Sequence, residues 1–347
     1  MSKKRASVLF LVCGYIVFCL VKYFPDIKSE IISSLEMWAY VLIPSLFPYL
    51  VISVFVTSSG ILKIFLPVTK IIAAIFNISE KSAEVYICSL FCGYPCGAVC
   101  SADLCRTGEI SDSEAEKLIC YTNNASPLFL VSVVGCSFIG SLTDGIALYV
   151  IQTLSAFLCA VLLRRTGTEH KIKPARMQNP HTNIAYCCEN AVRIMINICG
   201  FVVLSAVCSE IIFISFKTVS DALSINMPKY IECALYSLFE ISNGAKRITA
   251  YYNNKAGFAF LCAAVSWSGI SVFLQIKSAA AKNIKTKNLV YAKSIQAFFS
   301  LCLGYFYKSM PQKITRFYNG NKMIEISLAL SAIIFIIYIY KKIKQKA

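Results

Sequence analysis

The chain contains several uncharged apolar runs that are long enough to cross a lipid bilayer, and these runs constrain its fold more than any other feature. Residues 38–62 and 145–163 are two of them. At a helical rise of about 1.5 Å per residue, about 20 residues span a hydrocarbon core of about 30 Å. Inside that core every backbone amide and carbonyl needs an internal partner, which a helix supplies. The sequence therefore predicts an all-α integral membrane protein.

Composition and charge agree with this prediction. Hydrophobic residues make up 57% of the chain and charged residues 15%, against roughly 45–50% and 25% in soluble domains. The net charge is +16, and the cations lie between and beyond the apolar runs, as in the cytoplasmic loops of membrane proteins. We therefore expect the partner to be the lipid bilayer and not nucleic acid. Most of the 17 cysteines lie in apolar runs, where a thiol behaves as a small hydrophobe.

The apolar runs predict about eight transmembrane helices. We place them at residues 6–21, 38–62, 127–142, 145–163, 194–216, 256–276, 294–307 and 323–340. A cleaved signal peptide is the alternative for the first run, although no small-residue cleavage pattern follows it. Pro44 and Pro48 predict a kink in the second, because proline removes a backbone donor and clashes with the preceding turn.

The cation-rich segments set the predicted orientation in the cell membrane. Both termini are expected to be cytoplasmic, together with residues 164–193 and 277–293. Eight spans satisfy this arrangement only if residues 85–102 and 231–241 enter the membrane and return to the same side. We therefore predict two re-entrant or broken segments in addition to the eight helices.

The first broken segment has glycine and proline at its centre. Gly93, Tyr94, Pro95 and Gly97 interrupt an otherwise apolar run, and non-helical backbone at that depth must be buried in protein or line a polar cavity. We expect its free carbonyl and amide groups to bind a polar solute or an ion. The alternative is that Gly93 and Gly97 only let two helices approach closely.

A short pattern recurs in the two halves of the chain. Glu84-x4-Ser-Leu-Phe with a later Gly-Ala reappears from Glu232, with its Gly-Ala at Gly244, although chance similarity between apolar segments is an alternative. In the predicted topology the two copies run in opposite directions, as in secondary transporters whose site lies between inverted repeats near the bilayer midplane. The predicted segments are 1–36 (first helix and connector), 37–163 (first repeat), 164–193 (basic loop), 194–308 (second repeat) and 309–347 (last helix and tail).

Polar residues close to these breaks complete the candidate substrate site. Asn123, Asn124 and Ser126 precede a span, although they could simply cap the helix that Pro127 opens. Glu240 is a candidate for cation coupling, or else an interfacial acid paired with a nearby cation. The full candidate set is Gly93, Tyr94, Pro95, Gly97, Asn123, Asn124, Ser126, Glu240, Asn243, Gly244 and Ser268.

The sequence favours neither a metal site nor an enzyme. Cys92, Cys96 and Cys100 have a spacing that would align three thiols on one helical face, but the Pro-Gly break interrupts that helix. The chain has no phosphate-binding loop, no dinucleotide fingerprint and no set of nucleophile and base. We therefore expect no catalytic residues, no resident cofactor and no metal.

Two motifs resemble a known family. Gly93-Tyr94-Pro95-x-Gly97-Ala98 and the motif Thr-Asn-Asn-Ala-Ser-Pro at residues 122–127 are similar to those of the sporulation integral membrane protein YlbJ family. The wider group carries the Gate domain of nucleoside transporters and FeoB-type proteins, also called the nucleoside recognition domain. The resemblance is densest over residues 43–140 and weaker over 238–244 and 266–272. It implies a membrane protein needed for spore formation, with transport expected from the Gate domain.

Two functions follow as hypotheses. The first is a secondary transporter or permease for a small polar solute or ion, with a coupling cation possible. The alternative is a scaffold or regulator of spore cortex or envelope assembly that moves no solute, in which the basic loop at residues 164–193 contacts lipid headgroups or a partner protein.

Overall fold

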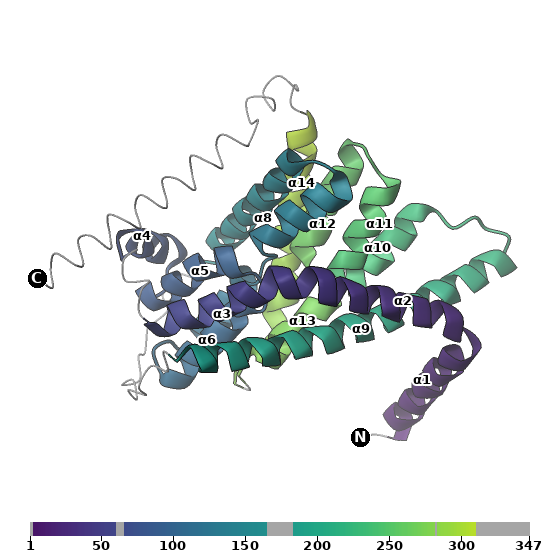
Figure 1. Ribbon diagram of the computed structural model, residues 1–347, viewed down its shortest axis with the longest axis horizontal. Coiled ribbons are helices and arrows are strands. Elements are labelled where there is room, and N and C mark those ends of the chain that lie inside the picture. The colour runs from purple at the N-terminus through teal and green to yellow at the C-terminus, as the bar shows by residue number, and fades with distance from the viewer. Residues whose placement is uncertain (1–2, 60–65, 165–182, 282, 310–347) are drawn as a thin grey trace, which may run out of the picture.

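The structure is a computed structural model that describes residues 3–59, 66–164, 183–281 and 283–309. Over these ranges the chain consists of helices joined by short connections, without strands (Figure 1). The all-α prediction is confirmed. The span expected at residues 323–340 and most of the basic loop lie outside the described residues.

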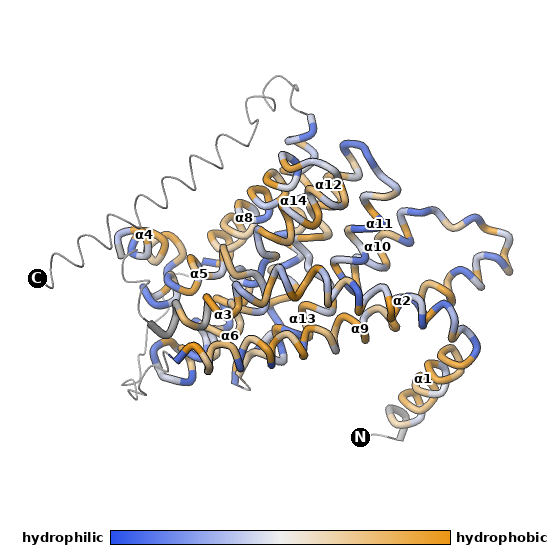
Figure 2. Tube along the Cα trace, in the orientation of Figure 1, coloured by the Kyte–Doolittle hydropathy of each residue, from blue (hydrophilic) through white to orange (hydrophobic). Residues whose placement is uncertain are grey.

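Several helical segments are long and apolar enough to cross a membrane. They are Phe24–Ile52, Leu142–Leu162, Ile184–Ala222, Lys255–Ala279 and Lys287–Ser309. Shorter apolar helices occur at Ala6–Lys22, Pro67–Phe76 and Phe129–Ile139. In Figure 2 apolar residues predominate along α1, α3 and α9. The chain is therefore a polytopic helical membrane protein, and the count of eight spans stays a prediction.

The N-terminal part is one long, locally disturbed rod after a first helix. Its elements are α1 (Lys3–Lys22), α2 (Phe24–Met37), the π-helical segment η1 (Trp38–Leu42) and α3 (Ile43–Ser59). The π-helical segment ends two residues before Pro44, and both Pro44 and Pro48 lie inside α3. A wider helical turn therefore lies next to the prolines, while the kink stays a prediction.

The first half continues with a short helix, a broken hairpin and three further helices. Its elements are α4 (Leu66–Phe76), α5 (Glu80–Cys92), α6 (Cys96–Thr107), α7 (Asp112–Thr122), the π-helical η3 (Phe129–Ile139) and α8 (Leu142–Leu162). The two ends of the α5–α6 hairpin meet, since Lys81 Nζ lies 4.0 Å from Glu109 Oε2. Helix α7 begins at Asp112, where Ser111 Oγ accepts a hydrogen bond from the Glu114 amide at 3.2 Å.

The second half has a similar order of elements. They are α9 (Ile184–Ala222), α10 (Lys229–Phe239), α11 (Ile241–Tyr251), α12 (Lys255–Trp267), α13 (Gly269–Ala279) and α14 (Lys287–Ser309). Two boundaries differ from expectation. Arg193, expected in the basic loop, lies inside α9. The single span expected at residues 256–276 is interrupted at Ser268, where the backbone turns left-handed with φ of 76°.

The open end of hairpin α5–α6 and the open end of hairpin α10–α11 lie at opposite ends of the helix pair α12–α13. The second hairpin closes where Lys229 Nζ lies 4.1 Å from the centroid of the Tyr251 ring, directly before α12 begins. The first hairpin closes beside α7, and the connection that follows α13 docks there, since the Lys285 amide donates to Glu116 Oε1 at 3.1 Å. The centre of the bundle is therefore approached by one hairpin from each end.

Candidate functional site

The first break lies between α5 and α6, at Gly93, Tyr94 and Pro95. Gly93 ends α5 with φ of 74° and ψ of 179°, a conformation that only glycine adopts without strain. A Cβ atom built on Gly93 would lie 2.9 Å from the Ser126 amide nitrogen. Glycine is therefore required here both by the backbone conformation and by the close approach of a second segment.

That second segment is a break in the first half between α7 and η3, formed by Asn123, Asn124 and Ser126. The Tyr94 amide donates to the Asn124 carbonyl at 2.7 Å, and the Ala98 amide donates to Asn123 Oδ1 at 3.0 Å. All three residues of the segment are buried. The two broken segments thus satisfy backbone groups of one another, as buried backbone requires.

Two of the structural alternatives that the sequence left open, helix capping and close helix packing, are observed. Ser126 Oγ accepts a hydrogen bond from the Phe129 amide at 3.2 Å, so Ser126 does cap the following helix. A Cβ atom on Gly97 would lie 2.8 Å from the Thr122 carbonyl oxygen, so Gly97 does serve close helix packing. Asn124 has a further role, described below.

In the second half, Glu240 lies at the break between α10 and α11 and is buried. Its Oε2 atom accepts a hydrogen bond from the Asn243 amide at 2.8 Å. Arg247 pairs instead with Glu232 at 3.3 Å and Glu30 at 3.4 Å. The interfacial pair proposed for Glu240 as an alternative is therefore not formed.

The remaining candidates of the second half lie at or beside the break between α10 and α11. Asn243 Nδ2 donates to Ser34 Oγ of α2 at 3.2 Å, and a Cβ atom on Gly244 would meet Ser237 of α10. Ser268 forms the break between α12 and α13, where a Cβ on the adjacent Gly269 would lie 3.1 Å from the Phe239 carbonyl oxygen. In both halves, therefore, a glycine of positive φ at one break touches the backbone of the other break.

A lysine of α14 joins the two halves. Lys293 has no exposed surface, and its ammonium donates to the Asn123 carbonyl at 2.6 Å and to Asn124 Oδ1 at 3.0 Å. Its third partner is Gln296 Oε1, at 3.0 Å. No carboxylate of the described residues forms an ion pair with it. An ionisable amine is thus held by three neutral oxygens in the middle of the protein, and in membrane proteins such a buried ionisable group marks a candidate functional position.

Polar side chains of α8, α12 and α14 extend this region. Ser300 Oγ lies 2.6 Å from both Ser155 Oγ and Ser266 Oγ. Gln152 of α8 is 1% exposed, and neither atom of its side-chain amide has a hydrogen-bond partner among the described residues. Buried amides are rarely left without partners, so the Gln152 amide is the group best placed to receive a water molecule or a polar solute.

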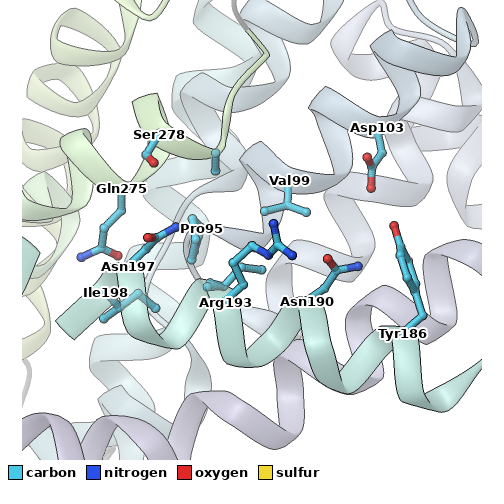
Figure 3. A pocket seen from close by; sticks show the side chains of 12 residues that line it. Pro95, Val99, Asp103, Tyr186, Asn190, Arg193, Asn197, Ile198, Gln275 and Ser278 are labelled. Carbon is cyan, nitrogen blue, oxygen red and sulfur yellow. The ribbon is translucent and has the colours of Figure 1, made fainter. Parts of the chain in front are cut away.

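A cavity of about 220 Å³ lies beside the first break (Figure 3). Pro95 and Asp103 line it from the α6 side, Arg193 and Asn197 from α9, and Gln275 from α13. Gln275 is buried, and its Oε1 atom has no hydrogen-bond partner in the described chain. In the close-up the Gln275 and Asn197 side chains lie near each other at one end, and the polar ends of Asp103 and Tyr186 point toward each other at the other end. The cavity thus extends from the charged side chains of Asp103 and Arg193 to Pro95 of the first break.

The structure brings the predicted residues together within each half, and it adds residues that the sequence did not single out. These are Lys293, Gln296, Gln152, Ser300 and Gln275. Lys293 was expected among the cations of a cytoplasmic segment, but it is buried inside α14. Its spacing of three residues from Gln296 places both on one helical face, which is the only local signal that could have indicated a buried role.

Comparison with known proteins gives one informative similarity. The chain is 24% identical over 304 residues to the sporulation integral membrane protein YlbJ of Bacillus subtilis (strain 168), covering 77% of this chain and 74% of the relative. No family model and no solved structure matches the chain. The similarity supports an integral membrane protein related to sporulation proteins, while the Gate domain stays a prediction.

Proposed function

We propose that this chain is a secondary transporter or permease that moves a small polar solute or an ion through a site between its two halves. The observation that carries the proposal is the buried Lys293 ammonium, held by Asn123, Asn124 and Gln296 where the broken segments of the first half meet α14. A scaffold has no need for a charge at this depth, because an apolar residue of similar volume would pack there at no electrostatic cost.

The arrangement of elements supports an inverted repeat. In the proposed correspondence, α5–α6 matches α10–α11, α7–η3 matches α12–α13, and α8 matches α14. The cross-contacts between halves are then reciprocal, since α6 packs against α13 as η3 packs against α11, and α7 packs against α14 as α8 packs against α12. Each hairpin enters from a different end, as expected for re-entrant segments of inverted halves.

The polar groups suggest how the site acts. Lys293 supplies a positive charge, and its oxygen partners lie on a backbone segment that is already broken. A bound solute can compete for Asn124 and Gln296, or can bring a negative charge to Lys293. The unpartnered Gln152 amide offers both a donor and acceptor. The cavity at Pro95 provides a route from one end of the bundle, which we assign to the cytoplasmic side with both termini. By its similarity to the Bacillus relative, we assign the chain to spore formation; no enzymatic step is part of this function.

Flux measurements on the purified full-length protein test the proposal. We would reconstitute it in liposomes and measure uptake of radiolabelled uridine, succinate and rubidium as a neutral, an anionic and a cationic probe. Wild-type protein should accumulate at least one probe above empty liposomes. Lys293→Met should reduce that uptake at least tenfold, because the buried cation is lost.

Lys308 of α14 provides the matched control. It pairs with Asp144 at 2.8 Å near the end of the helix, and about a third of its side chain is exposed (32%). Lys308→Met should retain most of the uptake. Equal loss in both variants, or no uptake of any probe by wild-type protein, would refute transport through this site. The scaffold hypothesis would then be tested by deleting residues 165–182 of the basic loop and scoring spore formation.

A further inference from the structure

We infer that the hairpin α5–α6 contains a binding site for a soft metal ion, formed by the thiols of Cys88, Cys92 and Cys96. This inference does not depend on the proposed transport function. The sequence predicted no metal site, because the break between the helices was expected to disrupt the regular spacing of the cysteines.

The structure shows that the break brings the thiols together. The three sulfur atoms lie within 4.8 Å of one another, and the Sγ atoms of Cys88 and Cys92 are 3.7 Å apart. Cys92 is the last residue of α5 and Cys96 the first residue of α6. The chain reversal at Gly93 therefore places thiols from two helices around one point.

The distances suit a thiolate-bound ion. Zinc-sulfur bonds of about 2.3 Å in a tetrahedral site place the sulfur atoms about 3.8 Å apart. The Cys88–Cys92 separation is close to this value, and no separation in the group exceeds it by more than about one ångström. Cys100 is the nearest source of a fourth ligand, since its Sγ atom lies 3.7 Å from Cys96 Sγ.

The cluster differs from the other cysteines of the chain. Across residues 3–59, 66–164, 183–281 and 283–309, this is the one group of three potential ligand atoms so close together. All three thiols are buried, and none forms a disulfide. Isolated buried cysteines, such as Cys19 and Cys233, fill apolar space as small hydrophobes. Three converging sulfur atoms with no other kind of ligand select thiophilic ions such as Zn²⁺ or Cu⁺ over Mg²⁺ or Ca²⁺.

Charge balance favours a divalent ion with three ligands. Each thiol must release its proton to solvent to coordinate, so three thiolates and one divalent ion leave a net charge of −1. The cavity described above is lined by Pro95, the residue that precedes Cys96 in the chain. A bound ion would tie α5 to α6 across the break and so stiffen this hairpin.

Cadmium is the probe for this site, because its thiolate complexes absorb in the ultraviolet. We would titrate metal-free, reduced full-length protein in detergent with Cd²⁺ and record the sulfur-to-cadmium absorption band. Wild-type protein should bind one Cd²⁺ per chain at this site, and Cd²⁺ should displace Zn²⁺ that was bound first, because thiolates prefer the softer ion. X-ray absorption should count three or four sulfur ligands and no others from the protein.

A matched pair of triple variants locates the site. Cys88→Ser with Cys92→Ser and Cys96→Ser should lose the band, whereas Cys19→Ser with Cys187→Ser and Cys233→Ser removes three equally buried thiols and should keep it. If the first triple variant does not fold, Cys92→Ala alone should weaken Cd²⁺ binding at least tenfold. No band in the wild type, or equal bands in both triple variants, would overturn the inference.

Discussion

Replacing Gly93 by alanine tests the packing of the two breaks against each other. Gly93 has φ of 74° and ψ of 179°, and placing a residue with a Cβ in this region costs about 1–3 kcal/mol. The new methyl group would also lie 2.9 Å from both Cβ and the amide nitrogen of Ser126. Moving that segment adds about 1–3 kcal/mol of overpacking. We expect Gly93→Ala to lower the free energy of unfolding by about 2–6 kcal/mol.

The assay is thermal denaturation in detergent, followed by size-exclusion chromatography of the protein that stays folded. Since about 1 kcal/mol shifts the Tm of a large domain by about 2–4 °C, Gly93→Ala should lower the Tm by at least about 4 °C. Gly200 is the control, because it lies inside α9 and a Cβ there meets nothing within 4 Å. Gly200→Ala should leave the Tm unchanged or raise it slightly, because alanine is the better helix former. Equal Tm values for the two variants would refute the close contact between the breaks.

Three further predictions concern the packing around the site. Gln152→Leu should raise the free energy of unfolding by up to about 1–3 kcal/mol, because it removes a buried amide without a partner. The same variant should lower probe uptake. A loss of stability would show that the amide has hydrogen-bond partners in the protein. Asp144→Asn and Lys308→Met should show a coupling of about 0.5–1 kcal/mol in a double-mutant cycle read by thermal denaturation, as expected for a partly exposed pair. Gly269→Ala should destabilise more than Gly140→Ala, since both have positive φ but only Gly269 faces backbone within 4 Å; equal Tm shifts would contradict this contact.

Much of the first broken segment could be predicted from its residues. Glycine and proline act on their own backbone, so the interruption at Gly93 and Pro95 follows from local chemistry. The start of α7 is local in the same way, since Ser111 caps the helix through an amide three residues away. The break at Ser268 was missed, because a serine with positive φ has no strong local signature and is held there by its surroundings.

The burial of the polar groups could not be predicted. Lys293 and Lys308 lie on the same helix and look alike in sequence, yet one is buried among neutral oxygens and the other pairs with Asp144 near the helix end. The difference arises because Asn123 and Asn124, which are distant in the sequence, supply hydrogen-bond acceptors for Lys293. No pattern within α14 itself could reveal these partners.

The sequence alone determined that the chain is a helical membrane protein with an interruption at Gly93, because hydrophobicity, cation placement and backbone freedom are properties of single residues and their neighbours. Only the tertiary structure decided which polar and sulfur groups meet. The buried ammonium, the unpartnered Gln152 amide and the thiols converging at the first hairpin all depend on how segments distant in the chain, or on either side of a break, are placed in space. Such placement is set by packing of the whole bundle and has no counterpart in local sequence.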